Sequence, residues 1–193
     1  MVPTQFKELL LQSLVHERGG VLVYQTALEC AINEDLRDEW TEYRAQTEKH
    51  VELLTAVCTA LGFDPDEMTP GCKVVQYTGK SLVVAMKMAL AEGRRPAAEL
   101  VACEAVVLAE TKDHADWELI GECAKALDGE AARILQAAYD EVENEEDEHL
   151  YHTKGWCREL WLNSLGLKAV LPPPEERKDV KSASEAEAAK KQR

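Results

Sequence analysis

The sequence predicts an all-α protein, a bundle of four long helices made of two hairpins joined by a long connection. Four stretches carry apolar residues at alternating steps of three and four, which places these residues on one face of a helix. No stretch alternates apolar and polar residues between closely spaced turn signals, as a half-buried strand does. A short turn joins the two stretches of each pair, whereas the longer segment of residues 63–95 separates the first pair from the second.

The first hairpin is predicted from residues 4–32 and 35–61, with a tight turn at 33–35. Gly62 and Pro65 end the second helix. The inward stripe of the first helix comprises Phe6, Leu10, Leu14, Glu17, Val21, Tyr24, Leu28 and Ile32. The stripe of the second comprises Leu36, Trp40, Tyr43, Thr47, His50, Leu54, Val57 and Leu61. Polar side chains therefore interrupt both stripes near their middles.

The connection over residues 63–95 contains turn residues and then an apolar segment. We expect one short helix at 80–92, between Gly79 and Gly93. A connection of this length can travel from one end of a bundle to the other. The two hairpins are therefore expected to be joined by a crossover.

The second hairpin is predicted from residues 96–127 and 130–165, with a turn at 128–129. Its first stripe comprises Leu100, Cys103, Val107, Glu110, His114, Trp117, Gly121 and Ala124. Its second comprises Leu135, Ala138, Val142, Glu145, His149, His152 and Trp156. Residues 1–170 are thus predicted to form one helical domain, and residues 171–193, rich in Glu, Lys and Ala, a flexible charged tail.

The polar interruptions of the four stripes fall at one height. Glu17 and His50 lie about 16 and 17 residues from the first turn, and Glu110 and Glu146 each lie about 18 residues from the second turn. Because a helix rises ~1.5 Å per residue, these similar counts place the four residues at similar heights. An ionised carboxylate is not left unpaired in a core, because its desolvation costs too much. Carboxylates and imidazoles together suit a hard or borderline cation such as iron, manganese or zinc. The predicted metal ligands are Glu17, His50, Glu110, His114, Glu146 and His149.

The residues Glu17, Thr47-x-x-His50, Glu110 and Glu146-x-x-His149 resemble the metal-binding motif of the ferritin-like superfamily. The closest likeness is to the rubrerythrins and the small stress-induced ferritin-like bundles. This resemblance implies an up-down-down-up four-helix bundle, a pair of iron or manganese ions, a reaction with oxygen or peroxide, and a role in stress. Thr47 departs from the family, which carries a second bridging Glu at this position.

Other functions remain open at this point. The bundle could be a metal-free structural or interaction protein that has lost the site, which Thr47 favours. The site could also hold a single metal. A third alternative is a mononuclear site of His50, His114 and His149, as in thiol-transferase bundles.

The composition of the chain limits the kinds of partner that the protein is expected to bind. The chain has 193 residues, 46% of them apolar, and a net charge of -14 at pH 7, so its surface is expected to repel nucleic acid and anionic lipid. No apolar run reaches the ~18 residues of a membrane span, and the N-terminus lacks the pattern of a signal peptide. The six cysteines form no Cys-x-x-Cys pair and are interpreted as reduced thiols of a cytoplasmic protein. The expected partner is a metal ion, and the expected assembly is a homodimer.

Overall fold

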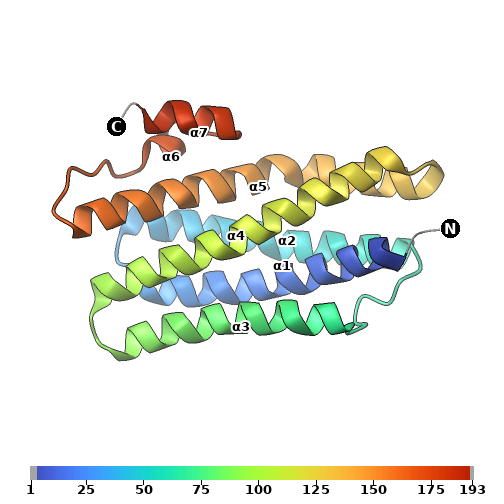
Figure 1. The fold of residues 1–193 in the computed structure, drawn as a ribbon, viewed down its shortest axis with the longest axis horizontal. Coiled ribbons are helices and arrows are strands. Elements are labelled where there is room, and N and C mark those ends of the chain that lie inside the picture. The colour runs from blue at the N-terminus through green and yellow to red at the C-terminus, as the bar shows by residue number, and fades with distance from the viewer. Residues whose placement is uncertain (1–3, 192–193) are drawn as a thin grey trace.

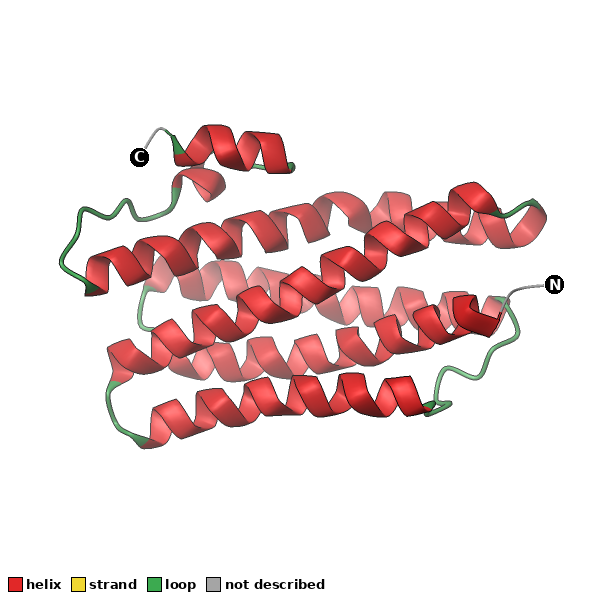
Figure 2. Ribbon diagram, in the orientation of Figure 1, coloured by secondary structure: helices red, strands yellow, loops and turns green. Residues whose placement is uncertain are grey.

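The computed structural model describes residues 4–191, and every regular element in that range is a helix (Figure 2). The all-α prediction is therefore confirmed. The helices are α1 (Thr4–Cys30), α2 (Glu34–Ala60), α3 (Pro70–Ala91), α4 (Arg95–Ala126), α5 (Gly129–Ser164), α6 (Pro174–Arg177) and α7 (Ala183–Lys190). Among these helices, none has both the length and the hydropathy that crossing a membrane requires.

The four longest predicted helices pack around a common centre. α1 contacts α2 and α4, and α5 contacts the same two helices from the other side. α1 and α5 run in one direction along the molecule, whereas α2 and α4 run in the other (Figure 1). α3 lies outside this group, against α1 and α4, and carries the chain back along its length.

α3 corrects the prediction of a short helix at 80–92, because it begins ten residues earlier, at Pro70. Its start is well defined: the Thr69 hydroxyl accepts a hydrogen bond of 3.0 Å from the Cys72 backbone N–H, and Pro70 occupies the first turn. Gly79, expected to precede the helix, lies inside it. A Cβ at Gly79 would lie 3.8 Å from Cα of Gly19 in α1, an ordinary van der Waals distance, so the two helices are in contact here.

The apolar core consists of two clusters. One contains buried residues from the second half of α1 and from the first halves of α2 and α4. Its fully buried members include Trp40 of α2 and Trp156 of α5. The other contains the first half of α1 and the later parts of α2 and α4, with Leu14 and Trp117. On each of the four long helices, buried polar side chains lie between the residues of one cluster and those of the other. The polar layer expected from the four stripes is thus enclosed by apolar packing at both ends.

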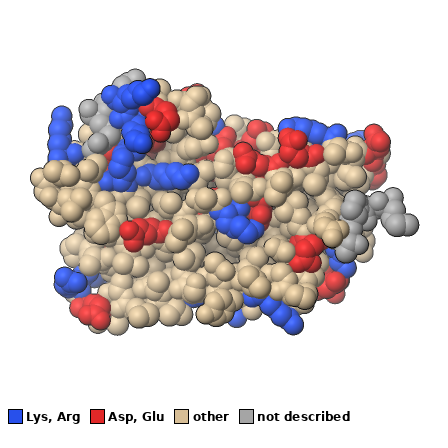
Figure 3. All heavy atoms as spheres, viewed as in Figure 1, with Lys and Arg blue, Asp and Glu red and all other residues tan. Residues whose placement is uncertain are grey.

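The C-terminal segment, predicted to be a flexible tail from residue 171, packs through α6 and α7 against α5 in the part that the structure describes. Val180 and Ala189 are buried there. Arg158 of α5 makes two parallel hydrogen bonds, of 2.7 and 2.8 Å, to the buried carboxylate of Glu175. Lys and Arg side chains gather over this segment on the face shown in Figure 3. The boundary between domain and tail stays a prediction.

Candidate metal centre

Five of the six predicted ligands meet in the centre of the four long helices. Each is at most 2% exposed, and each of α1, α2 and α4 contributes one, while α5 contributes two. They are Glu17, His50, Glu110, Glu146 and His149. Their ligand atoms form two groups, Glu17–His50–Glu146 and Glu110–His149–Glu146, and within each group all atoms lie within 4.8 Å of one another. Glu146 belongs to both groups.

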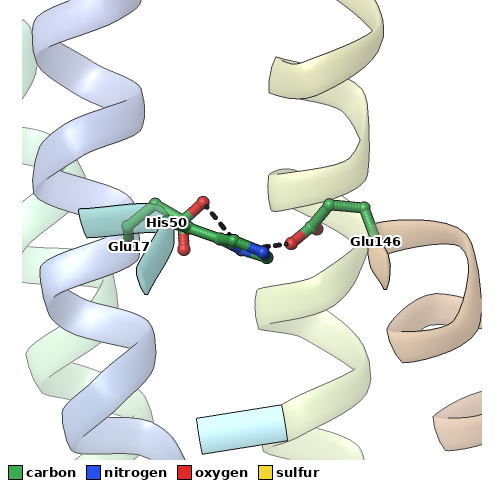
Figure 4. Close-up of side chains that lie close together, drawn as sticks. All are labelled: Glu17, His50 and Glu146. Atoms are coloured by element: carbon green, nitrogen blue, oxygen red, sulfur yellow. Dashed lines mark ion pairs between the residues drawn. The ribbon is translucent and has the colours of Figure 1, made fainter. Parts of the chain in front are cut away.

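In the first group, the ring of His50 lies between the carboxylates of Glu17 and Glu146 (Figure 4). Its Nδ1 is 3.5 Å from Oε1 of Glu17 and 3.1 Å from Oε1 of Glu146. In the second group, Nδ1 of His149 is 3.4 Å from Oε2 of Glu110 and 3.6 Å from the same Oε1 of Glu146. One oxygen of Glu146 therefore faces both imidazoles.

The outer nitrogens of both imidazoles are held by acceptors. Nε2 of His50 lies 2.8 Å from Oε2 of Glu145, and Nε2 of His149 lies 2.7 Å from the amide oxygen of Gln46. Because both partners only accept, each Nε2 carries the donated proton, and the inward Nδ1 keeps a lone pair when the ring is neutral. Metal-binding histidines are oriented in this way, with the far N–H hydrogen-bonded to a carboxylate or carbonyl.

Beyond the contacts of 3.1–3.6 Å between the imidazoles and the carboxylates, the inward atoms of the site have no hydrogen-bond partner. These atoms are Glu17 Oε2, His50 Nδ1, Glu110 Oε2, both carboxylate oxygens of Glu146 and His149 Nδ1. An unsatisfied buried polar atom costs ~1–3 kcal/mol, and more when it is charged. All of these atoms are potential metal ligands, and they converge on one place, so the residues present fit a bound cation.

Protons neutralise part of this charge when no metal is bound. Burial by itself lowers the pKa of His50, but its contacts with Glu145, Glu146 and Glu17 outweigh burial and raise the pKa to about 12. Burial likewise lowers the pKa of His149, and Glu110 reverses the direction. A metal ion at this site must therefore displace protons from the imidazoles.

Aromatic side chains hold the carboxylates from outside. The indole N–H of Trp117 donates a 2.8 Å hydrogen bond to Oε1 of Glu17. Tyr24 is fully buried, and its pKa is raised well above the usual value by burial and then by Glu110. The ring of Tyr43 lies 4.2 Å from that of His149, centre to centre. Aromatic side chains thus border the site, and Glu146 also lines a small pocket together with Trp117 and three further carboxylates.

His114 is the predicted ligand that the structure does not bring into either group. Its side chain is 18% exposed, and its Nε2 lies 3.7 Å from Asp147 and 3.9 Å from Glu118. The ring also contacts Tyr151. His114 therefore lies at the side of α4 and α5, away from the paired imidazoles.

Asp113 is a buried carboxylate near the site that the stripe of α4 did not predict. It is 3% exposed, and its Oδ1 has no hydrogen-bond partner. Burial, followed by the charges of Glu17, Glu146 and Glu110, raises its pKa well above the usual value. The sequence does contain a signal, because the spacing Glu110-x-x-Asp113 places both carboxylates on one helix face.

Thr47, at the position where the resemblance implies a bridging Glu, has a satisfied side chain. It is 3% exposed, and its hydroxyl donates a 2.8 Å hydrogen bond to the carbonyl oxygen of Tyr43. Its methyl group would lie 3.3 Å from a Cβ added at Gly20, so α1 and α2 are close here.

No protein-family model matches the chain, and neither a curated protein nor a solved structure matches it. A functional conclusion therefore depends on the geometry of the buried groups.

Proposed function

We propose that this protein binds a pair of divalent transition-metal ions in the centre of its long helices. Glu17 and His50 would hold one ion, Glu110 and His149 the other, and Glu146 would bridge them. The observation that carries the proposal is the orientation of the two imidazoles: both Nδ1 atoms point inward, toward the carboxylates of the two groups, and both Nε2 atoms are held from outside.

The helix order supports a ferritin-like bundle. α1, α2, α4 and α5 each contribute to the site, and their directions correspond to up-down-down-up with α3 in the crossover. Carboxylate and imidazole ligands suit iron and manganese, and also zinc. Bound iron or manganese would supply the redox chemistry with oxygen or peroxide that the resemblance implies.

Metal analysis tests this proposal. After expression with added iron or manganese, the purified protein is expected to contain about two equivalents of metal, because two ligand groups share Glu146. Less than about 0.2 equivalents of iron, manganese or zinc would contradict it. A value near one would show that the two ligand groups do not fill together and would refute the bridged pair.

A metal-free bundle is the second candidate, and two observations favour it. Thr47 replaces the bridging Glu without leaving a polar atom unsatisfied. Protonated His50 neutralises nearby carboxylates without any metal. This alternative predicts that excess chelator leaves the melting temperature of the protein, as purified, unchanged.

Metal binding is expected to release protons at neutral pH. The folded-state pKa of His50 is raised to about 12 from 6.5, so its proton stabilises the metal-free fold at pH 7, and this contribution is lost as pH rises toward 12. The metal must displace that proton, and its apparent affinity should therefore rise with pH. Calorimetric titration in two buffers of different ionisation enthalpy measures the release. Observed heats of binding that are the same in the two buffers would contradict it.

A further inference from the structure

A second polar cavity lies between α2, α5 and α6. Its volume is about 380 Å³. Six carboxylates line it: Asp35, Asp38, Glu39, Glu42, Glu148 and Glu176. No Lys or Arg is among its lining residues. Lys181 makes an ion pair of 2.6 Å with Glu148, but no such cation faces the cavity from its lining residues, so its walls are mainly negative and favour cations.

His152 adds an unpartnered nitrogen to the wall of this cavity. Its side chain is 6% exposed, and its Nδ1 lies 2.9 Å from the hydroxyl of Tyr43 and 3.6 Å from Oε1 of Glu39. Because Nδ1 of His152 faces a carboxylate and a phenol oxygen, the proton of the neutral ring is expected on Nδ1. The lone pair is then on Nε2. This Nε2 is buried and has no hydrogen-bond partner. It is therefore available to a cation, in the arrangement that metal-binding histidines adopt.

The carboxylate of Glu39 is arranged in a similar way. Its Oε2 accepts a hydrogen bond from the indole N–H of Trp156, whereas its Oε1 is buried without a partner. Glu176 of α6 also lines the cavity, and its Oε2 is buried without a hydrogen-bond partner. Carboxylates of α2 and α6 thus line the same cavity.

Tyr43 connects this cavity with the metal centre. It lines the cavity, its hydroxyl contacts His152, and its ring lies 4.2 Å from the ring of His149. One aromatic side chain therefore lies between the acidic cavity and the second ligand group of the centre.

We propose that this acidic cavity is a second divalent-cation site, through which metal ions reach the bundle centre. The inference rests on the proposed function of that centre. Among the described residues, only the two central groups bring three ligand atoms within 4.8 Å. An ion in the cavity therefore keeps part of its water shell, is held by Glu39 and His152, and leaves readily for the tighter site beyond Tyr43.

Uptake of cobalt(II) provides the test, because cobalt bound to imidazole and carboxylate can be followed by its visible absorbance. The variant Asp38→Asn/Glu42→Gln removes two exposed charges from the cavity wall. The control Asp140→Asn/Glu141→Gln removes two exposed charges from α5, outside the cavity. Neither variant changes a residue of the centre, and both have the same net charge.

At low ionic strength, stopped-flow mixing should show uptake about tenfold slower in the cavity variant and within about twofold of the native rate in the control. The equilibrium affinity of the centre should be unchanged in both variants. The difference in rate should shrink as salt screens the cavity. Equal uptake rates in the two variants would overturn the inference alone, whereas no cobalt binding by the native protein would overturn the proposed centre as well.

Discussion

Replacing Glu146 by Gln is expected to lower the affinity for metal by at least about 100-fold, the largest effect of any single substitution. Glu146 is the one carboxylate in both ligand groups, and its Oε1 faces both His50 and His149. The amide keeps the shape of the side chain but removes the charge that a metal needs when its ligands are desolvated. Equilibrium titration of the metal-free protein with manganese(II) or cobalt(II) measures the loss.

The neighbours of Glu146 provide two comparison variants, of which Asp147→Asn is the matched control. Glu145→Gln keeps a weaker acceptor for Nε2 of His50. Changes to such hydrogen-bond partners of a metal ligand lower the metal affinity by about 10- to 100-fold. Asp147→Asn changes a carboxylate that belongs to neither group and should leave the affinity within about twofold. A Glu146→Gln variant that binds metal as tightly as Asp147→Asn would exclude the bridging role.

Saturating metal is expected to raise the melting temperature by about 8–16 °C. A ligand at 1,000 times its Kd stabilises a fold by ~4 kcal/mol, and 1 kcal/mol corresponds to about 2–4 °C for a chain of this size. The effect should be pronounced here because the metal also pairs buried atoms that otherwise lack partners. Differential scanning calorimetry with and without metal measures the shift.

The Glu146→Gln variant is the control for this stabilisation, because it should melt at nearly the same temperature with and without metal. Chelator should return the native protein to its metal-free melting temperature. If metal shifts both proteins equally, the ions bind elsewhere on this acidic chain. If it shifts neither, the metal-free bundle is the better description.

The long helices could be predicted from the sequence because each buries an apolar stripe, and the period of that stripe is local information. The common height of Glu17, His50, Glu110 and Glu146 follows from counting residues from two turns. The structure brings these residues together within the buried layer.

The period of an apolar stripe does not decide which of two neighbouring helix residues points into the core. The stripe of α5 passes through Glu145, yet Glu145 is 34% exposed and holds His50 from outside, while Glu146 is buried. Asp113 escaped the stripe of α4 for the same reason, since that helix is buried against α1 as well as α5 and its inward face is wider than one stripe.

Other features depend on contacts between distant segments, which the sequence pattern does not display. Along its length, α3 packs against α1 and α4, which are distant in sequence from its first residues. The position of the C-terminal segment depends on the pairing of Arg158 with Glu175. The acidic cavity likewise depends on distant segments, because α2, α5 and α6 all contribute residues to its wall.

The most direct test is a crystal structure of metal-loaded protein with anomalous scattering data collected at the absorption edge of the bound metal. We predict two peaks in the bundle centre, one about 2.0–2.2 Å from Nδ1 of His50 and one at the same distance from Nδ1 of His149, with the Glu146 carboxylate between them. Peaks on the Nε2 side of either ring, or a centre without any peak in protein that contains metal, would contradict the proposed site.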